Sequence, residues 1–365
     1  MKHVLTLLLA FASIGILPAQ NLASRLPEGR FVVVEEFTGV RCQFCPDGHT
    51  ILKNIINQYP TEVTGIGYHP TTSGLTSPVS STDPDLRRAW PNDLYASSFA
   101  LGNAPMPSAF INRRVFGNTR WQSRGVWSNY ARNTRAQLST VNVGMKAEYD
   151  TAFNLIIVDV EVYYTANTND HTLSILLTED SVVATQIVSG SPTNSNYIHN
   201  HVFRESITMN TWGDSIHTAP QRGNSYTKQF YFDNNLTRYN WKNLNVVAIL
   251  RDVTNEEITS GTEVHHIGPL NVSTGIEKLD FSQDIEMFPN PTEGTSTVQF
   301  TTTESTAITA KVFTVMGQEV DFVDFGTRSA GTQKLSLDVS ELPAGVYMVE
   351  LTAGNAKGVK RLIKQ

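Results

Sequence analysis

The two cysteines of this 365-residue chain, Cys42 and Cys45, lie in the segment FVVVEEFTGVRCQFCPDGHTILKNIINQY, residues 31–59. The β-branched run that opens this segment predicts a strand that ends near Gly39. Apolar residues then recur at helical spacing: Ile51, Leu52, Ile55, Ile56 and Tyr59. The pattern therefore predicts a strand, a tight turn and a helix, with Cys42 where the helix begins.

This predicted position favours reactive sulfur chemistry. The first backbone N–H groups of a helix have no partner within the helix, and the helix dipole is positive there, so both favour a thiolate at Cys42. Arg41 acts in the same direction. Cys45, one helical turn further on, can close a small disulfide ring with Cys42, and Pro46 is tolerated because first-turn N–H groups have no helical partner to lose.

The N-terminal segment and the composition indicate an exported protein. Residues 1–20 combine Lys2 and His3 with an apolar stretch and Pro-Ala-Gln, which predicts a secretory signal peptide cut near Gln20. No later run reaches about 18 apolar residues, so no transmembrane span is expected. A formal charge of −6 without a basic run argues against a nucleic-acid partner. Export puts the two cysteines in an oxidising setting, where they are expected to pair.

Residues 26–140 read as an α/β unit. Residues 63–69 predict a second strand, residues 70–84 a loop, and Trp90-Pro91 opens a predicted helix that ends at Gly102. A strand over residues 108–112 and a helix near residues 121–138 follow. The alternation of strands and helices predicts a three-layer α/β domain with helical insertions.

Two β-rich units are predicted after residue 140. Residues 141–270 show runs of period two separated by Gly, Asn, Asp and Thr clusters, which predict an antiparallel β-sandwich. Residues 271–284 read as a linker. Residues 285–365 hold short strand-like runs after the turn cluster FPNPTEG, so they predict a small C-terminal β-sandwich.

The first unit resembles the thioredoxin superfamily. Cys42-Gln43-Phe44-Cys45 follows a hydrophobic strand, Glu36 lies six residues before the first cysteine, and Met106-Pro107-Ser108 is similar to the family's cis-proline loop. The resemblance implies that Cys42 exchanges with substrate, Cys45 resolves the mixed disulfide, Glu36 moves protons and Pro107 holds the substrate chain. Arg41 replaces the family's usual tryptophan, and a long insertion precedes Pro107.

Residues 285–365 resemble the type A sorting domain of type IX secretion. The matching blocks are FPNPTEG, VFTVMGQEV, LSLDVSELPAGVYMVEL and GVKRLIKQ. This resemblance implies handling by the type IX machinery, passage through the outer membrane of a Gram-negative cell, removal of the domain, and release or attachment to surface lipopolysaccharide.

Most of residues 28–270 resemble the outer membrane protein 28-related family. The blocks that carry this resemblance are EEFTGVRCQFCPDG, IGYHP, FINRR, LLTED and NYIHNHVFR. The family couples a thioredoxin-like region to a β-sandwich, so the resemblance implies an architecture and a location at the cell surface or outer membrane.

Three interpretations of Cys42 and Cys45 stay open: thiol-disulfide exchange, an inert disulfide that staples the turn, and metal binding. A structural zinc ion normally takes four ligands, which disfavours the third. Glu35 and Glu36 alternate across a strand, so one is expected to point inward and the other outward. If Glu36 is the inward residue, burial raises its pKa and suits it to proton transfer.

The histidines offer weaker candidates. On a strand, His199 and His201 would share one face, as metal ligands do, but no third ligand stands at useful spacing, so hydrogen-bonded histidines at a sandwich edge are favoured. The adjacent His265 and His266 are expected on opposite faces of any strand. His69, at the end of the second strand, is expected near the rim of the cysteine site.

The sequence therefore predicts an exported cell-surface protein that can exchange disulfides with extracytoplasmic proteins or peptides. It predicts no cofactor and no metal site. The alternative is a non-enzymatic surface binding protein, adhesin-like, with a structural disulfide; the sequence leaves the choice open.

Overall fold

The computed structural model describes residues 21–151, 154–208, 210–234, 239–270, 285–314, 318–354 and 356–365. The predicted signal peptide, residues 1–20, and the predicted linker, residues 271–284, lie outside these described residues. Across the described ranges, helices are all too short or too polar to span a bilayer. The protein is β-rich, with several sheets and more than one core.

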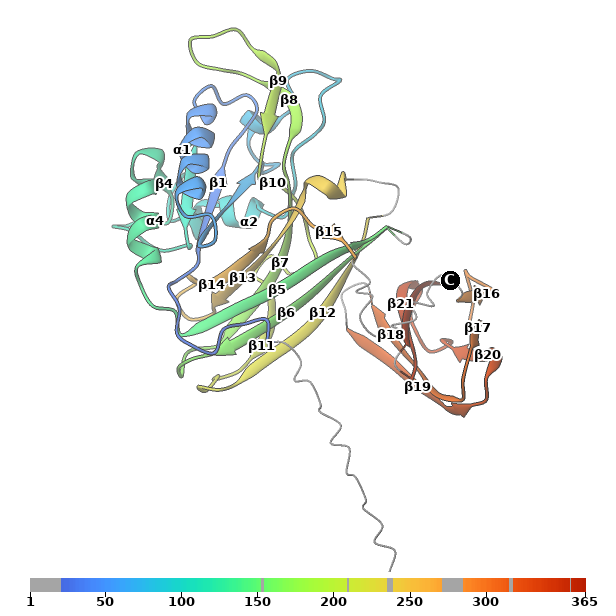
Figure 1. Cartoon of the computed structure of the whole chain (residues 1–365). Helices are drawn as coiled ribbons and strands as arrows, with labels where there is room; N and C mark the ends of the chain where they lie inside the picture. Colours follow the sequence, from blue (N-terminus) through green and yellow to red (C-terminus); the bar gives the residue numbers. More distant parts are fainter. Residues whose placement is uncertain are drawn as a thin grey trace, which may run out of the picture.

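The predicted strand, turn and helix are present at the start of the chain (Figure 1). Strand β1 (Val32–Phe37) pairs in parallel with β2 (Val63–Tyr68) and antiparallel with β3 (Ser108–Ile111). Helices α1 (Cys45–Gln58) and α4 (Trp127–Arg135) pack on one face of β1. The buried contacts of that face include Val32, Val34, Leu52, Ile55 and Trp127. The central strand is therefore covered by apolar side chains.

The insertion between β2 and β3 differs from the expected single helix. It holds η1 (Gly74–Thr76) and two one-turn helices, α2 (Asn92–Tyr95) and α3 (Ser97–Ala100). Ala96 separates the two helices because its ψ of 139° is extended, and Leu101 ends α3 in the left-handed region with φ of 58°.

The helix predicted near residues 121–138 is also shorter than expected. Its first residues form β4 (Gln122–Ser123), which pairs with β3, and then η2 (Arg124–Val126). Helix α4 follows these two elements. Sheet pairing therefore overrides helical spacing at the start of this segment.

One sheet runs through both the first and the second predicted units. Its strand order is β14-β13-β7-β10-β2-β1-β3-β4, with β11 paired to β7. Val202 pairs with Gly67 of β2 and with Glu179 of β7, so it joins the two halves. The added strands are β7 (His171–Glu179), β10 (Val202–Ser206), β11 (Asp214–His217), β13 (Leu244–Asp252) and β14 (Ile258–Val264). The predicted boundary at residue 140 thus does not separate two sheets.

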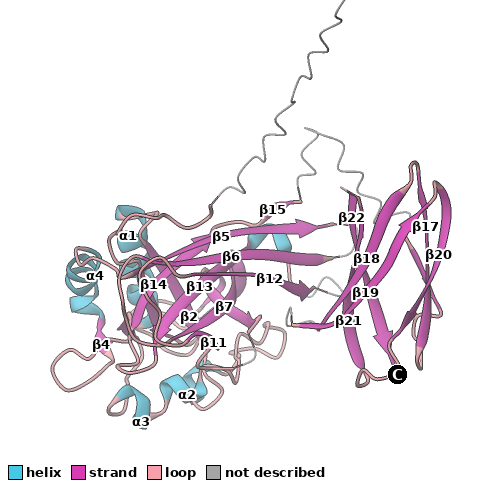
Figure 2. Ribbon diagram, turned by 90° about the horizontal axis from the view of Figure 1, so that it is seen from below, coloured by secondary structure: helices cyan, strands magenta, loops and turns pink. Residues whose placement is uncertain are grey.

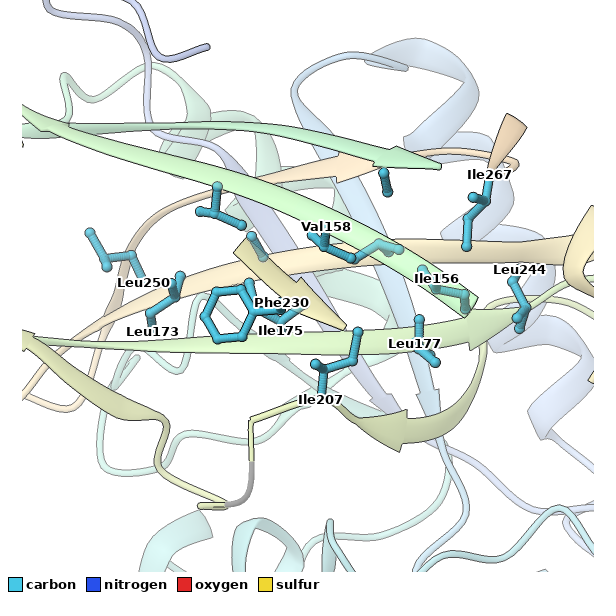
Figure 3. Close-up of a cluster of buried hydrophobic side chains, with 14 of the residues drawn as sticks. Ile156, Val158, Leu173, Ile175, Leu177, Ile207, Phe230, Leu244, Leu250 and Ile267 are labelled. Carbon is cyan, nitrogen blue, oxygen red and sulfur yellow. The ribbon is translucent and has the colours of Figure 1, made fainter. Parts of the chain in front are cut away.

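A second sheet packs across β7 and β13 to form the sandwich core (Figures 2 and 3). It has the order β12-β6-β5-β15. Its strands are β5 (Val141–Asp150), β6 (Leu155–Tyr164), β12 (Ser225–Asp233) and β15 (Gly268–Pro269). Figure 3 shows Ile156 and Val158 of this sheet close to Ile175 and Leu177 of the other. Most of the period-two runs therefore lie in two sheets that pack face to face, as expected, but β15 pairs with β5 in parallel, and one of the two sheets continues into the first predicted unit.

A hairpin rises from the end of the large sheet next to helix α1 (Figure 1). It consists of β8 (Val182–Gln186) and β9 (Asn194–His199), which pair only with each other among the described strands. The short helix η4 (Trp241–Asn243) precedes β13. The hairpin is the part of the second predicted unit that reaches the cysteine turn.

The C-terminal region has two facing sheets and its own core. The sheets have the orders β16-β17-β20 and β19-β18-β21-β22. The strands are β16 (Glu286–Phe288), β17 (Thr295–Thr302), β18 (Thr306–Thr314), β19 (Glu319–Arg328), β20 (Gly331–Asp338), β21 (Gly345–Ala353) and β22 (Ala356–Lys364). Val298 and Leu335 of one sheet share the core with Val312 and Leu351 of the other. This agrees with the predicted small β-sandwich.

Candidate functional site

Cys42 and Cys45 form a disulfide, with 5.4 Å between their Cα atoms. Helix α1 begins at Cys45 with Pro46 in its first turn, so Cys42 lies three residues before the helix instead of at its first residue. The amide of Cys45 donates to the carbonyl oxygen of Cys42 at 3.2 Å, which closes a turn ahead of the helix. Cys42 is 4% exposed and Cys45 is fully buried, so both cysteines lie in the core, and Cys42 is the slightly more accessible residue.

Arg41 does not act on the cysteines as expected. Its guanidinium donates from Nε to the carbonyl of Ser77 at 3.0 Å and from Nη2 to that of Pro78 at 2.6 Å. The backbone amide of Arg41 donates to Leu75. The side chain therefore anchors the loop of residues 70–84 to the cysteine turn.

Both acidic residues of β1 are buried, which corrects the expectation that one faces solvent. Glu35 pairs with the buried Arg113 through two hydrogen bonds of 2.7 and 2.9 Å and accepts a third from Tyr68. Glu36 lies on the opposite face, and its Oε1 has no hydrogen-bond partner among the described residues. Side chains alternate between the two faces of β1, so the two carboxyls lie on opposite faces. Both faces are covered by other elements, so neither carboxyl is exposed.

Burial raises the pKa of Glu36 well above its ordinary value. A carboxyl with a raised pKa keeps its proton closer to neutral pH, which is the state needed to protonate a leaving thiolate. The proton-transfer role of Glu36 stays a prediction.

Gly48 brings three predicted elements together beneath the first turns of α1. A Cβ on Gly48 would lie 2.6 Å from Oε1 of Glu36, 3.1 Å from Cβ of Pro107 and 3.2 Å from the ring of Trp127. The bond between Met106 and Pro107 is cis. Because Ser108 pairs with Phe37, Pro107 lies beside the end of β1. Helix α1, Glu36 and the proline loop therefore meet at one point.

His49 is a member of the site that the sequence did not single out. Its Nε2 lies 2.8 Å from the hydroxyl of Thr38 and 3.8 Å from Oε1 of Glu36, and its Nδ1 lies 2.8 Å from the hydroxyl of Tyr197. Burial, with the nearby His199 and His201, lowers the pKa of His49 to about 3. The imidazole is therefore neutral at physiological pH.

The segment after β8 lies over the cysteine turn. The side-chain amide of Gln186 donates to the carbonyl of Cys42 at 3.0 Å. The amide of Ile187 donates to Val40 at 2.9 Å, and that of Ser189 to Gln43 at 3.0 Å. These hydrogen bonds join the disulfide turn to a segment far away in sequence, and they account for part of its burial.

His69 and His199 are both buried, with ring centroids 6.2 Å apart. The ring nitrogens of both have no hydrogen-bond partner among the described residues. Burial lowers the pKa of His199 to about 4 and that of His69 well below its ordinary value. His69 therefore lies near the site, as expected, but away from solvent.

His199 and His201 do not share a face. His199 ends β9 and packs against His49, whereas His201 follows in a turn with φ of 56° and lies beside Asp180. His265 and His266 come after β14 ends, and their rings are 4.1 Å apart, so the expectation of opposite faces is wrong. A left-handed residue at His266, with φ of 54°, removes the strand alternation on which that expectation depended.

A cavity of about 680 Å³ extends from this site along helix α1. Glu36, His49 and Tyr197 line one part of it, and His201 and His265 line another. The signal for His49 is its helical spacing, four residues after Cys45. Tyr197 carried no such signal, because it reaches His49 from 148 residues away.

The comparisons with known proteins agree with the two later resemblances. Residues 94–266 match the family model of the outer membrane protein Omp28, and residues 286–365 match that of the secretion system C-terminal sorting domain. No curated protein sequence matches the chain.

Among solved structures, the chain is similar to HBP35 of Porphyromonas gingivalis, at 17% identity and a TM-score of 0.53. That match covers 93% of this chain and 99% of the other, and it shows a shared fold. A domain of the outer membrane lipoprotein Omp28 from Porphyromonas gingivalis is similar over 36% of this chain and 91% of the other, at 18% identity and a TM-score of 0.26.

These matches confirm the predicted export route and location. The sorting domain implies handling by the type IX secretion machinery, and the protein is secreted or held at the outer membrane or cell surface of a Gram-negative bacterium. The chain therefore contains a region, residues 94–266, that matches the outer membrane protein Omp28 family, followed by a C-terminal sorting domain of type IX secretion over residues 286–365.

Proposed function

We propose that residues 26–140 form a thioredoxin-like unit whose Cys42–Cys45 pair exchanges disulfides with extracytoplasmic proteins or peptides. The observation that carries the proposal is Glu36, a buried carboxyl with no hydrogen-bond partner among the described residues, held under the first turns of the helix that Cys45 opens. A buried polar group without a partner is costly, so a chemical role explains its presence better than a structural one.

The reaction starts from the disulfide. A substrate thiolate attacks Sγ of Cys42, which belongs to the less deeply buried of the two cysteines, and the Cys42–Cys45 bond breaks. Cys45 leaves as a thiolate and takes a proton from Glu36. A second substrate thiolate then attacks the substrate sulfur of the mixed disulfide and releases Cys42. The substrate gains a disulfide, and the protein gains the two electrons as a dithiol; the same steps run backwards reduce a substrate disulfide.

Two further residues support binding of a polypeptide next to the cysteines. Phe44, between the two cysteines, is 47% exposed, and the guanidinium of Arg124 lies 5.8 Å from its ring centre. Pro107 lies beside the end of β1, next to the turn that leads to Cys42. An exposed aromatic ring between the two cysteines and a proline loop beside the end of β1 suit an extended peptide as substrate.

The direct test is disulfide exchange by the purified protein. We expect it to reduce the disulfides of insulin with a supplied thiol reductant, or to oxidise a reduced peptide, and we expect Cys42→Ser to abolish both activities. Cys45→Ser should trap a mixed disulfide between Cys42 and the substrate, which mass spectrometry detects. Ser80→Ala, on an exposed loop, serves as the matched control.

A second candidate function, that of a surface binding protein, is based on the segment that covers the disulfide turn. The hydrogen bonds from Gln186, Ile187 and Ser189 hold a separate segment against the cysteine turn, as suits a structural staple in a surface binding protein. A redox titration separates the two. A reduction potential below about −300 mV together with no turnover would favour the binding protein, since structural disulfides resist reduction in that range.

A further inference from the structure

Three turns converge at the end of the large sheet where the strands lead toward the cysteine site. Asp180 follows β7, His201 lies between β9 and β10, and His265 and His266 follow β14. One ligand atom from each of Asp180, His265 and His266 lies within 4.8 Å of the other two. All four residues line the 680 Å³ cavity, so a small ion can reach them.

The carboxylate of Asp180 is the buried centre of this cluster. Its Oδ1 lies 3.6 Å from Nδ1 of His201, and its Oδ2 lies 4.0 Å from Nδ1 of His265. Asp180 is 6% exposed, whereas His265 and His266 are exposed. An anionic oxygen therefore lies at the base of the cluster, with imidazole nitrogens toward the solvent side.

A polar framework holds this carboxylate in place. The side-chain amide of Asn245 donates to Oδ2 of Asp180 at 2.9 Å, and its carbonyl oxygen accepts from the backbone amide of His266 at 2.7 Å. The backbone amide of His201 donates to Oδ1 at 2.6 Å. Asn245 thus connects two members of the cluster, as outer groups do around metal ligands.

Two polar atoms at the cluster are buried without a hydrogen-bond partner among the described residues. They are Nδ1 of His201 and Oε1 of Glu263, and the latter lies 4.0 Å from Nδ1 of His265. Buried nitrogen and oxygen lone pairs are normally satisfied, so their presence here points to a ligand that accepts electron pairs.

We propose that Asp180, His265 and His266 bind a divalent metal ion of the zinc class, with His201 as a fourth nitrogen within reach. Imidazole nitrogens and a carboxylate oxygen are the ligands that zinc takes at about 2.0–2.2 Å, which places neighbouring ligand atoms roughly 3.3 Å apart in a tetrahedral site. The ligand atoms, now within 4.8 Å of one another, must move closer together to bind the ion. Rotation of the exposed histidine side chains can bring them together while the buried carboxylate stays in place.

The sequence concealed this set because its members come from three separate turns. The HNH string of residues 199–201 offered two histidines without a third ligand, and only one of them belongs to the cluster. The ladder of β7 with β10 brings Asp180 to His201, and the ladders of β7 with β13 and of β13 with β14 bring His265 to Asp180. The proposal concerns a site separate from Cys42 and Cys45 and does not depend on their redox activity.

The test is a titration of the metal-free, oxidised full chain with Zn²⁺, and with Co²⁺ as a spectroscopic probe. The Cys42–Cys45 disulfide must be intact, because reduced thiols bind zinc themselves. We expect one Zn²⁺ per chain and Co²⁺ absorption bands typical of tetrahedral nitrogen and oxygen ligands. Asp180→Asn, and His265→Gln combined with His266→Asn, should each weaken Zn²⁺ binding by ~100-fold, and Asn245→Ala by ~10-fold.

Lys53→Ala is the matched control, since Lys53 lines the same cavity and offers no ligand at neutral pH. It should leave the affinity unchanged. Circular dichroism of each variant checks that the fold is retained. The proposal is overturned if the folded protein binds no Zn²⁺, or if Asp180→Asn binds it as tightly as the wild type, which would mean that the exposed histidines act without the buried carboxylate.

Discussion

Oε1 of Glu36 lies 3.8 Å from Nε2 of His49, yet burial shifts the two pKa values in directions that favour uncharged forms of both. The pKa of the carboxyl is raised, and that of the imidazole is lowered to about 3. Burial therefore works against an ion pair between Glu36 and His49, because it favours the protonated carboxyl and the neutral imidazole.

Replacing Glu36 with Gln should separate the effect of the buried carboxyl on stability from its effect on disulfide exchange. The folded pKa of Glu36 is raised, so its contribution to stability is present below the unfolded pKa of about 4.5 and is lost as the pH rises. Glu36→Gln should therefore be more stable than the wild type at pH 8, with the difference shrinking at pH 4, while exchange activity falls. Urea unfolding at the two pH values measures the first effect, and an equal difference at both would contradict the assigned pKa shift.

Gly48→Ala should disturb the junction of Glu36 and Pro107. The added Cβ would lie 2.6 Å from Oε1 of Glu36, so one of the buried groups must shift, at a cost of about 1–3 kcal/mol in the free energy of unfolding. Gly125→Ala is the control, because nothing lies within 4 Å of its Cβ position. Thermal unfolding of the two variants should differ, and equal midpoints would show that the junction adapts freely.

Breaking the buried pair of Glu35 and Arg113 should lower the free energy of unfolding more than replacing the whole pair with apolar side chains. Glu35→Gln leaves a buried guanidinium without its counter-charge, which should lower the free energy of unfolding by about 3–5 kcal/mol. Replacing the whole set, with Glu35→Leu, Tyr68→Phe and Arg113→Met, should be closer to the wild type than the single change. Denaturant unfolding checks the order, and a triple variant less stable than Glu35→Gln would contradict it.

Acid should destabilise the protein through its buried histidines. Burial lowers the pKa of His199 to about 4 from an unfolded value of 6.5, so the unfolded state binds the extra proton as the pH falls below 6.5. At pH 5 this costs ~2 kcal/mol. Glu36 and Glu263 have raised pKa values that give the opposite slope, so the informative quantity is the difference between the wild type and His199→Gln.

That difference should move by ~2 kcal/mol in favour of His199→Gln between pH 7 and pH 5, as measured by urea unfolding. His171 is a second instance, because burial lowers its pKa to about 4 as well, away from the cysteine site. His171→Gln should show a similar change. If the stability difference between the wild type and each variant does not change with pH, the two imidazoles are protonated equally well in the folded and unfolded states, which would contradict the lowered pKa values.

Removal of residues 360–365 should stop surface display and leave the protein in the periplasm. The segment forms the second half of β22, pairs with β21, and buries Leu362 in the C-terminal core. Leu362→Ala distinguishes loss of folding from loss of a recognised sequence, since it weakens the core but keeps the strand. Surface protease accessibility reports the location, and full display of the truncated chain would count against the sorting role of this end.

Local patterns predicted the parts of the structure that local forces determine. The strand and helix around Cys42 and Cys45 and most sandwich strands follow from side-chain periodicity within ten to fifteen residues. Strand β9, NSNYIH, was missed because its residues are polar and partly exposed. It is held by pairing with β8, which no local pattern within β9 encodes.

The candidate site shows the same division. Cys42, Cys45, Glu36 and Pro107 are the site residues that the thioredoxin resemblance implies, whereas Tyr197 contacts His49 from 148 residues away and Gln186 contacts Cys42 from 144 residues away. Their contribution depends on how the large sheet places the β8–β9 hairpin over α1. A single sequence does not reveal which distant segments come into contact, so these two residues could not be predicted as part of the site.

Strand β10 lies beside β2, where Val202 pairs with Gly67, and this has a practical consequence for any attempt to isolate residues 26–140. In a recombinant fragment that stops at residue 140, β2 would be an exposed edge strand. Its unpaired backbone N–H and C=O groups could then pair with a strand of another molecule. Such a fragment should self-associate instead of behaving as a monomer, and gentle protease treatment should fail to split the native chain there.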